Sequence, residues 1–168
     1  MAEVVFPRHE YYMRLALREA ERAAKHGDVP VGCVIVLDGE VIASAGNERE
    51  LRASPTAHAE ILAIEDAAKR MGTWRLLNTV IYVTIEPCPM CAGAIIQARI
   101  ALLVYALADP LTGAAGSVFD LLSVPYLNHR VEVLSGVLAG EVGDLMDDFF
   151  RELRSRAPWR KTESGEVA

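Results

Sequence analysis

Apolar side chains recur at helical spacing in four parts of the chain. In the first, 9–25, Tyr12, Ala16 and Ala23 fall on one side of the expected helix, and His26-Gly27 ends the pattern. The other three parts are 56–71, 88–98 and 141–156. This spacing predicts four helices that each bury one face.

Short runs of β-branched and apolar residues lie between these helices. Val31 to Leu37 and Glu40 to Ala45 are separated by Asp38-Gly39, a dipeptide typical of a two-residue hairpin turn. The two runs therefore predict a β-hairpin. The other predicted strands are 79–85, 101–105 and 131–134.

Polar residues, Gly and Pro mark the connections. Residues 46–55 form a predicted polar loop, and Thr56 is placed to cap the helix that follows. Pro89 suits the first turn of its helix, where a backbone N–H is not needed. Residues 106–130 are expected to be mostly loop, with one helical turn near 118–122.

A hairpin followed by alternating strands and helices predicts an α/β fold. Such an order gives a mixed sheet with helices on both faces. Ligands of open α/β folds bind beyond the strand ends, where the following helices begin. The helices at 56–71 and 88–98 are therefore expected to bring their N-termini together at one rim of the sheet.

The 168 residues, 52% of them apolar, are enough for one domain with a sizeable core. We expect this domain to span 1–156, with 157–168 as a flexible C-terminal tail. The apolar run 92–108 is interrupted by Gln97 and Arg99, so no membrane-spanning helix is expected. Three cysteines without a secretory leader favour a reducing, cytoplasmic location.

The net charge of −6 argues against broad, nonspecific nucleic-acid binding. The exception is 151–161, which holds five cations and one acid. These cations suit a solvated helix end, where they stabilise the helix dipole. They also suit contact with phosphates, and the pattern alone leaves both interpretations open.

Four side chains form a catalytic pattern for zinc. His58 and Glu60 open one predicted helix, and Cys88 and Cys91 open another. Catalytic zinc sites use three protein ligands and keep one position for water, whereas structural sites use four. Residues two apart differ by about 200° around a helix, so His58 and Glu60 suit separate tasks. His58 and the two thiols would bind the metal, and Glu60 would move protons.

Each motif alone permits another interpretation. Cys-x-x-Cys after a strand is also the pattern of a thioredoxin-like redox pair. A structural zinc site would need a fourth ligand, and Cys33 lies in a strand where a small buried hydrophobe is expected. The two motifs together favour zinc hydrolase chemistry.

The chain resembles the zinc-dependent cytidine and deoxycytidylate deaminase superfamily, whose pattern is H-x-E…P-C-x-x-C. Within it, the chain is similar to the bacterial tRNA-specific adenosine deaminases along nearly its whole length. The matching stretches are Val29–Gly32, Gly46-Asn47, Pro55–Glu60, Glu86–Ala94, Thr112–Ser117, Asn128–Arg130 and Phe149-Phe150.

The resemblance implies a three-layer α/β/α cytidine-deaminase-like fold with a central mixed five-stranded sheet. It implies hydrolytic deamination of adenosine to inosine at the wobble position (34) of a tRNA anticodon, most often in an arginine tRNA. One Zn²⁺ per subunit and a homodimer follow from the same resemblance.

The resemblance also implies roles for further residues. Asn47 would bind the base edge, Val31 would line the base pocket, and Asp109 would meet the nucleotide and its sugar. The residues expected near flanking nucleotides are Phe149, Arg151 and Arg154.

Two other functions stay open on the sequence. One is a small-molecule deaminase acting on guanine, cytosine or cytidylate, which would not need the basic C-terminal stretch. The other is a noncatalytic zinc or dithiol protein, which would have no use for Glu60.

Overall fold

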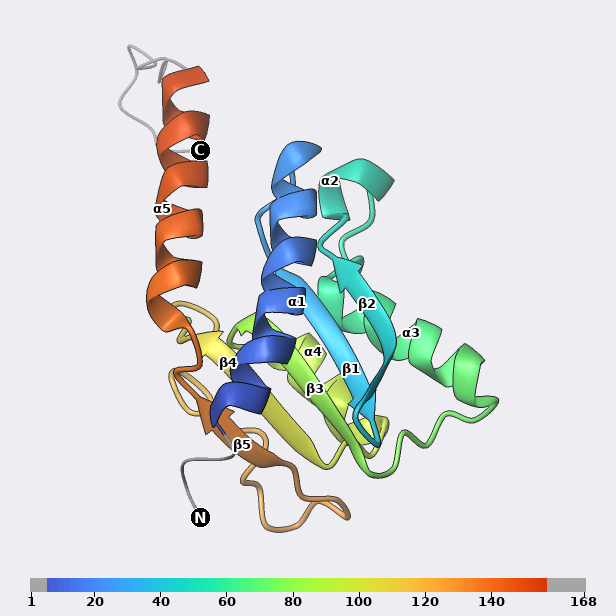
Figure 1. Ribbon diagram of the computed structural model, residues 1–168. Helices are drawn as coiled ribbons and strands as arrows, with labels where there is room; N and C mark the ends of the chain where they lie inside the picture. Colours follow the sequence, from blue (N-terminus) through green and yellow to red (C-terminus); the bar gives the residue numbers. More distant parts are fainter. Residues whose placement is uncertain (1–5, 157–168) are drawn as a thin grey trace.

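A computed structural model describes residues 6–156 of the chain (Figure 1). The predicted tail at 157–168 lies outside the described residues. The elements are α1 (Phe6–Lys25), β1 (Gly32–Leu37), β2 (Glu40–Gly46), α2 (Arg49–Arg52), α3 (Ala59–Met71), β3 (Thr79–Ile85), α4 (Pro89–Gln97), β4 (Leu102–Leu107), β5 (Glu132–Ser135) and α5 (Ala139–Arg156).

The five strands form one sheet in the order β2-β1-β3-β4-β5. β1 pairs antiparallel with β2 and β3, whereas β3, β4 and β5 run parallel. α1 and α5 cover one face of the sheet, and α3 and α4 cover the other (Figure 1). The predicted three-layer fold with a mixed five-stranded sheet is confirmed.

Alternating side chains of the central strands fill a core on each face. Val34, Tyr82 and Val104 pack on the side of α1 and α5. Cys33 and Ile81 belong to the cluster on the side of α3 and α4. Cys33 is fully buried, as expected of a small hydrophobe.

Close packing of α1 on the hairpin fixes the position of Val31 and Asn47. A Cβ added at Gly32 would lie 1.9 Å from the carbonyl oxygen of Ala16, so only glycine allows this approach. Next to this contact, the N–H of Asn47 donates to the carbonyl of Val31 at 2.9 Å. The start and the end of the hairpin, at Val31 and Asn47, therefore lie side by side.

Two expectations for the segment before α3 are wrong. Thr56 does not cap α3, because the helix begins at Ala59 with His58 at its N-cap position. The predicted loop at 46–55 contains the short helix α2. Two N–H groups in its single turn, those of Glu50 and Leu51, donate to the buried Asp28 carboxylate at 2.7 and 3.1 Å. Asp28 lies far away in sequence, so local pattern could not reveal this capping contact.

The predicted helical turn at 118–122 is also wrong. The N–H groups of Val118 and Phe119 donate to the carbonyl of Gly113, and Ala115 forms an isolated bridge with Asp120. These contacts fold the segment back on itself instead of into a helix. None of the described helices is long and apolar enough to cross a membrane.

Candidate active site

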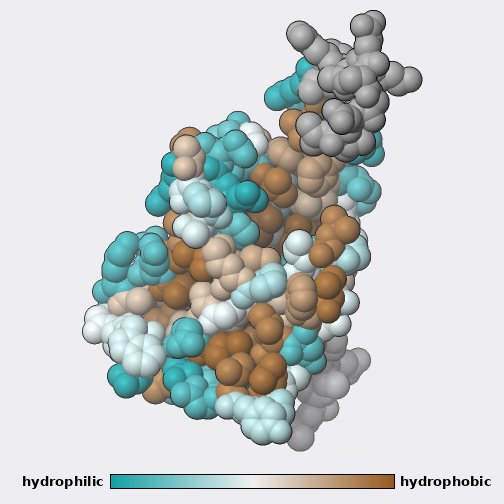
Figure 2. Space-filling model, turned by 180° about the vertical axis from the view of Figure 1, so that it is seen from behind, coloured by the Kyte–Doolittle hydropathy of each residue, from teal (hydrophilic) through white to brown (hydrophobic). Residues whose placement is uncertain are grey.

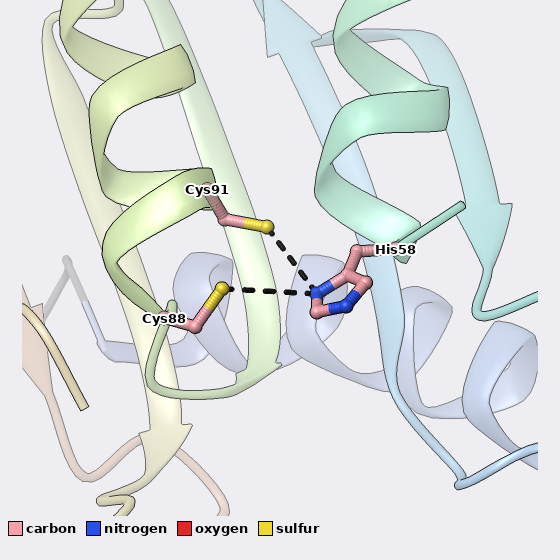
Figure 3. Close-up of side chains that lie close together, drawn as sticks. All are labelled: His58, Cys88 and Cys91. Atoms are coloured by element: carbon pink, nitrogen blue, oxygen red, sulfur yellow. Dashed lines mark hydrogen bonds between the residues drawn. The ribbon is translucent and has the colours of Figure 1, made fainter. Parts of the chain in front are cut away.

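The three predicted metal ligands meet at the start of two helices. His58 is the N-cap residue of α3, Cys88 is the N-cap residue of α4, and Cys91 lies one turn further along α4. Their side chains point toward one another across the gap between the helices (Figure 3). The Nδ1 atom of His58 lies 3.8 Å from Sγ of Cys88 and 3.6 Å from Sγ of Cys91.

These distances match the edges of a tetrahedral zinc site. Zn–S bonds of about 2.3 Å and Zn–N bonds of about 2.1 Å place nitrogen and sulfur ligands about 3.6 Å apart. The three ligating atoms all lie within 4.8 Å of one another, and no fourth His, Cys, Asp or Glu joins them within residues 6–156. The group could therefore hold one zinc ion with one position free.

The electrostatics of the group favour a thiolate. Hydrogen bonding from Cys91, aided by His58 and opposed by burial, lowers the pKa of Cys88 to about 4. The hydrogen bond with Cys88 likewise raises the pKa of His58. Metal ligation by cysteine requires the thiolate, and the neighbouring groups favour that form at Cys88, whereas the hydrogen bond with Cys88 raises the pKa of Cys91.

Glu60 lies in the first turn of α3 with only 3% of its surface exposed. Burial raises the pKa of its carboxyl group. Its buried Oε2 atom has no hydrogen-bond partner among the described residues. A buried carboxyl oxygen without a partner is costly unless a ligand or water occupies the site. Its pKa and unsatisfied oxygen suit a group that gives and takes protons.

A cavity of about 360 Å³ opens above these residues. This volume lies within the range of small-molecule sites. One wall contains Val29, Val31 and Asn47, and the opposite wall is the segment Leu107–Thr112. His58, Glu60 and Cys88 also line the cavity.

The side chain of Asn47 lines the cavity and has one hydrogen-bond acceptor that is not used. Its Nδ2 atom donates to the carbonyl of Val29 at 3.2 Å. Its buried Oδ1 atom has no partner within 6–156. The amide can therefore accept a hydrogen bond from a bound ligand.

Asp109 organises the opposite wall. Its carboxylate accepts the N–H of Leu111 at 2.9 Å and both the N–H and the hydroxyl of Thr112, at 3.2 and 2.6 Å. Burial alone would raise the pKa of Asp109, but these hydrogen bonds outweigh it and lower the pKa. The loop is therefore held around an ionised carboxylate.

The C-terminal helix supplies part of the cavity lining. Met146 and Phe150 line the cavity, whereas Phe149 does not. The two Phe rings pack edge to face with centroids 5.3 Å apart. Arg151 and Arg154 are exposed beyond the cavity on the part of α5 that extends past the sheet (Figure 1). Their contact with RNA stays a prediction.

Two charged lining residues had no role in the sequence analysis. Arg49 is an exposed cation at the start of α2, a helix that was not predicted. Glu86 is 2% exposed and follows the apolar strand β3. A charged residue at the carboxyl end of a buried strand was the available signal for Glu86.

Comparisons with known proteins agree with this geometry. A sequence model of the MafB19-like deaminases matches residues 8–154. The tRNA-specific adenosine deaminase of Bacillus subtilis is 48% identical over 147 residues, which cover 88% of this chain and 91% of the relative. A solved structure from biochemical and structural studies of A-to-I editing by tRNA:A34 deaminases at the wobble position of transfer RNA is 44% identical. It superposes with a TM-score of 0.78 over 80% of this chain and 98% of its own.

A guanine deaminase from Nitrosomonas europaea is more distant. It is 22% identical with a TM-score of 0.68, over 83% of each chain. This likeness shows a shared fold and carries no information on the substrate.

Proposed function

The chain belongs to the tRNA-specific adenosine deaminases, and we propose that it hydrolyses adenosine to inosine at the wobble position, 34, of a tRNA anticodon. The observation that carries the proposal is the convergence of His58, Cys88 and Cys91 beside Glu60 at the base of a cavity. Zinc deaminases use this set of residue types to replace an exocyclic amine with oxygen.

His58, Cys88 and Cys91 would hold one zinc ion per subunit. When bound, zinc would supply a Lewis acid that lowers the pKa of water toward about 7. Two sulfurs and one nitrogen at tetrahedral separations support this choice of metal.

Glu60 would carry the protons. It would take one proton from the water that attacks C6 of adenine and deliver it to N1. It would then carry the second proton from the new C6 hydroxyl to the amino group, so that the C6–N bond breaks, ammonia leaves and the C6 carbonyl forms. The burial of Glu60 beside the ligand group and its unpaired Oε2 atom support this exchange.

The cavity walls would hold the nucleotide. The open Oδ1 of Asn47 would accept from the base edge, and Val31 would cover the base. Asp109 would present its loop to the sugar. An anticodon loop displays unstacked bases, so the target can enter without opening a duplex.

The C-terminal helix would contact the neighbouring nucleotides through Phe149, Arg151 and Arg154. Phe150 joins them in this proposal, because it lines the cavity. Exposed cations at the edge of an acidic chain suit the phosphates that flank the target. The resemblance favours an arginine tRNA as substrate and the cytoplasm as location. Activity confined to another tRNA would contradict the arginine tRNA as substrate. Recovery of the protein in a secreted fraction would contradict the cytoplasmic location.

A small-molecule deaminase is not favoured. The comparisons that name tRNA enzymes reach 44–48% identity, whereas the guanine deaminase shares the fold at 22%. The noncatalytic alternative is not favoured either, since Glu60 lies buried beside the ligand group.

A homodimer through the outer face of α3 and α4 is part of the proposal. Viewed from that side, hydrophobic atoms gather in the middle of the molecule (Figure 2). A groove of about 340 Å³ lies there, with Ile61, Ile64 and Trp74 in its lining, and Trp74 is 52% exposed. Exposed apolar patches of this kind mark protein contacts. Sedimentation with the mass of one chain at micromolar concentration would contradict the dimer.

The decisive experiment uses an anticodon stem-loop with adenosine at the wobble position. The zinc-loaded protein is expected to convert that adenosine to inosine, detected by nuclease digestion and mass spectrometry. Guanine and cytidine, incubated in parallel, are expected to stay unchanged. Deamination of either one without inosine in the stem-loop would replace this proposal with the small-molecule alternative.

A further inference from the structure

Glu86 is a buried carboxylate that the proposed chemistry does not use. It follows β3 directly and precedes the metal-binding turn at Cys88 by two residues. Only 2% of its surface is exposed. A charge buried to this degree persists only where hydrogen bonds compensate it.

The compensating donors all come from one loop, residues 109–117. Oε1 accepts the N–H groups of Ala115 at 2.9 Å and Ser117 at 3.0 Å. Oε2 accepts the N–H of Asp109 at 3.0 Å and the hydroxyl of Ser117. One carboxylate therefore holds both ends of the loop.

The backbone around Glu86 adds two further ties. Its own N–H donates to the carbonyl of Leu107 at 2.8 Å, and the N–H of Ala114 donates to the carbonyl of Pro87 at 2.8 Å. A Cβ added at Gly113 would lie 2.4 Å from Oε2 of Glu86. The loop thus wraps so closely around the carboxylate that only glycine fits at this position.

The chemistry of the cluster requires a carboxylate. Four donors point at two oxygens, which together have about four lone-pair sites. A glutamine of the same shape would turn an NH₂ group toward some of these donors and leave them unpaired. All four partners of the two oxygens are N–H or O–H donors, so the cluster satisfies the side chain as an acceptor only, which is its ionised form.

The same loop forms a wall of the cavity. Asp109 and Thr112, which it carries, both line the cavity, and Glu86 reaches the cavity itself. The connection between β3 and α4 holds the loop on one side and carries Cys88 on the other. It thereby links the nucleotide wall to the metal-ligand group.

We propose that Glu86 is a positioning residue, whose carboxylate fixes the 109–117 loop relative to the His58, Cys88 and Cys91 group. The nucleotide held by the loop then keeps a constant position relative to the reacting centre. The identity of that nucleotide rests on the proposed function, whereas the clamp on the loop does not.

The first test compares E86Q with E132Q, both zinc-loaded. Glu132 is an exposed residue of β5, so its substitution makes the same chemical change outside the cavity. Amide hydrogen exchange at Ala115 and Ser117 is expected to be about tenfold faster in E86Q and unchanged in E132Q. Unchanged exchange in E86Q would overturn the proposal, whatever the substrate is.

The second test measures coupling on the anticodon stem-loop. Because a displacement of about 1 Å can cost a hundredfold in rate, kcat/KM of E86Q is expected to fall about 30-fold, with zinc content retained. D109A is expected to lower kcat/KM by a much smaller factor when E86Q is already present than it does in the wild type, since Asp109 is already displaced in E86Q. Fully additive losses would mean that Glu86 does not act through Asp109, and would overturn the proposal.

Two further variants test the same contact in case E86Q does not fold stably. S117A removes one donor and leaves the carboxylate, so exchange at Asp109 is expected to rise by a smaller factor. G113A pushes the loop away from Glu86 from the opposite side and is expected to reproduce the E86Q exchange pattern. If the wild type forms no inosine, the proposed function fails and the exchange data still decide the role of Glu86.

Discussion

The floor and the rim of the cavity are built in opposite ways. The floor consists of His58, Glu60, Cys88 and Cys91, all placed by the first turns of two helices that pack on the same face of the sheet. The rim consists of Leu111, Met146 and Phe150, which come from a loop and a distant helix, and the exposed Arg151 and Arg154 continue it along α5 beyond the cavity itself. Leu111 is 82% exposed, whereas Glu60 is 3% exposed.

This difference separates chemistry from recognition. Reacting groups need fixed geometry, which rigid helix ends provide. Substrate contacts need reach and variety, which loops and exposed helix ends provide on a stable scaffold. The floor should therefore control turnover at saturating RNA, and the rim should control binding.

The strongest test of this division is E60Q. The substitution keeps the shape of the side chain and removes its ability to accept the proton of water. We expect turnover of the stem-loop to fall about 1,000-fold. Zinc content, measured by atomic absorption, should stay near one per chain, and RNA affinity should change little. E132Q serves as the control with the same chemical change.

If E60Q kept a turnover close to that of the wild type, another group would have to move the proton. A loss of zinc or of RNA affinity in E60Q would mean that the floor and rim are not separable in function.

The sequence was a good guide to the floor because short-range patterns determine it. The spacing of His58 and Glu60 and of Cys88 and Cys91 placed each pair at a helix start, and the alternation of strands placed those starts at one edge of the sheet. The structure brings these ligands together as expected. Only the start of α3 shifted, because His58 rather than Thr56 takes the N-cap position.

The walls and the rim of the cavity were harder to predict because long-range contacts decide them. Asp28 caps α2 from 22 residues away, and Glu86 gathers donors from a loop that begins 23 residues later. Helical spacing could not decide which of Phe149 and Phe150 faces the cavity, since α5 packs on several elements at once. Such contacts appear only when the whole domain is assembled.

The two phenylalanines offer the next test. Phe150 lines the cavity, whereas Phe149 packs against its ring. Loss of an aromatic contact with a base costs about 1–3 kcal/mol, so F150A is expected to lower kcat/KM about tenfold, mainly through KM. F149A is the matched control at the neighbouring position and should lower kcat/KM by a smaller factor. Steady-state kinetics on the stem-loop compares the two.

Equal losses in F149A and F150A would indicate that the pair acts as one packed unit. A larger loss in F149A would favour the nucleotide contact that the sequence predicted for Phe149.

The smallest expected effect concerns the cations at the end of the rim. Arg151 makes an exposed i,i+3 ion pair with Asp148, and Arg154 is exposed one turn further on. Exposed pairs of this kind contribute little to stability, so R151A/R154A is expected to unfold at nearly the wild-type temperature. If both arginines meet phosphates, their removal lowers the slope of log affinity against log salt by about 1.4, because each contact with a single strand contributes about 0.7.

The matched control is R22A/K69A, which removes two exposed cations that also make i,i+3 ion pairs on α1 and α3. It changes the net charge equally, but its residues lie on α1 and α3 and not on α5. A general electrostatic attraction would lower the affinity of both variants alike, whereas direct phosphate contact lowers only that of R151A/R154A. A salt slope of R151A/R154A equal to that of the wild type would therefore assign the basic stretch to the helix dipole, the alternative that the sequence left open, and would confine the rim to Leu111, Met146 and Phe150.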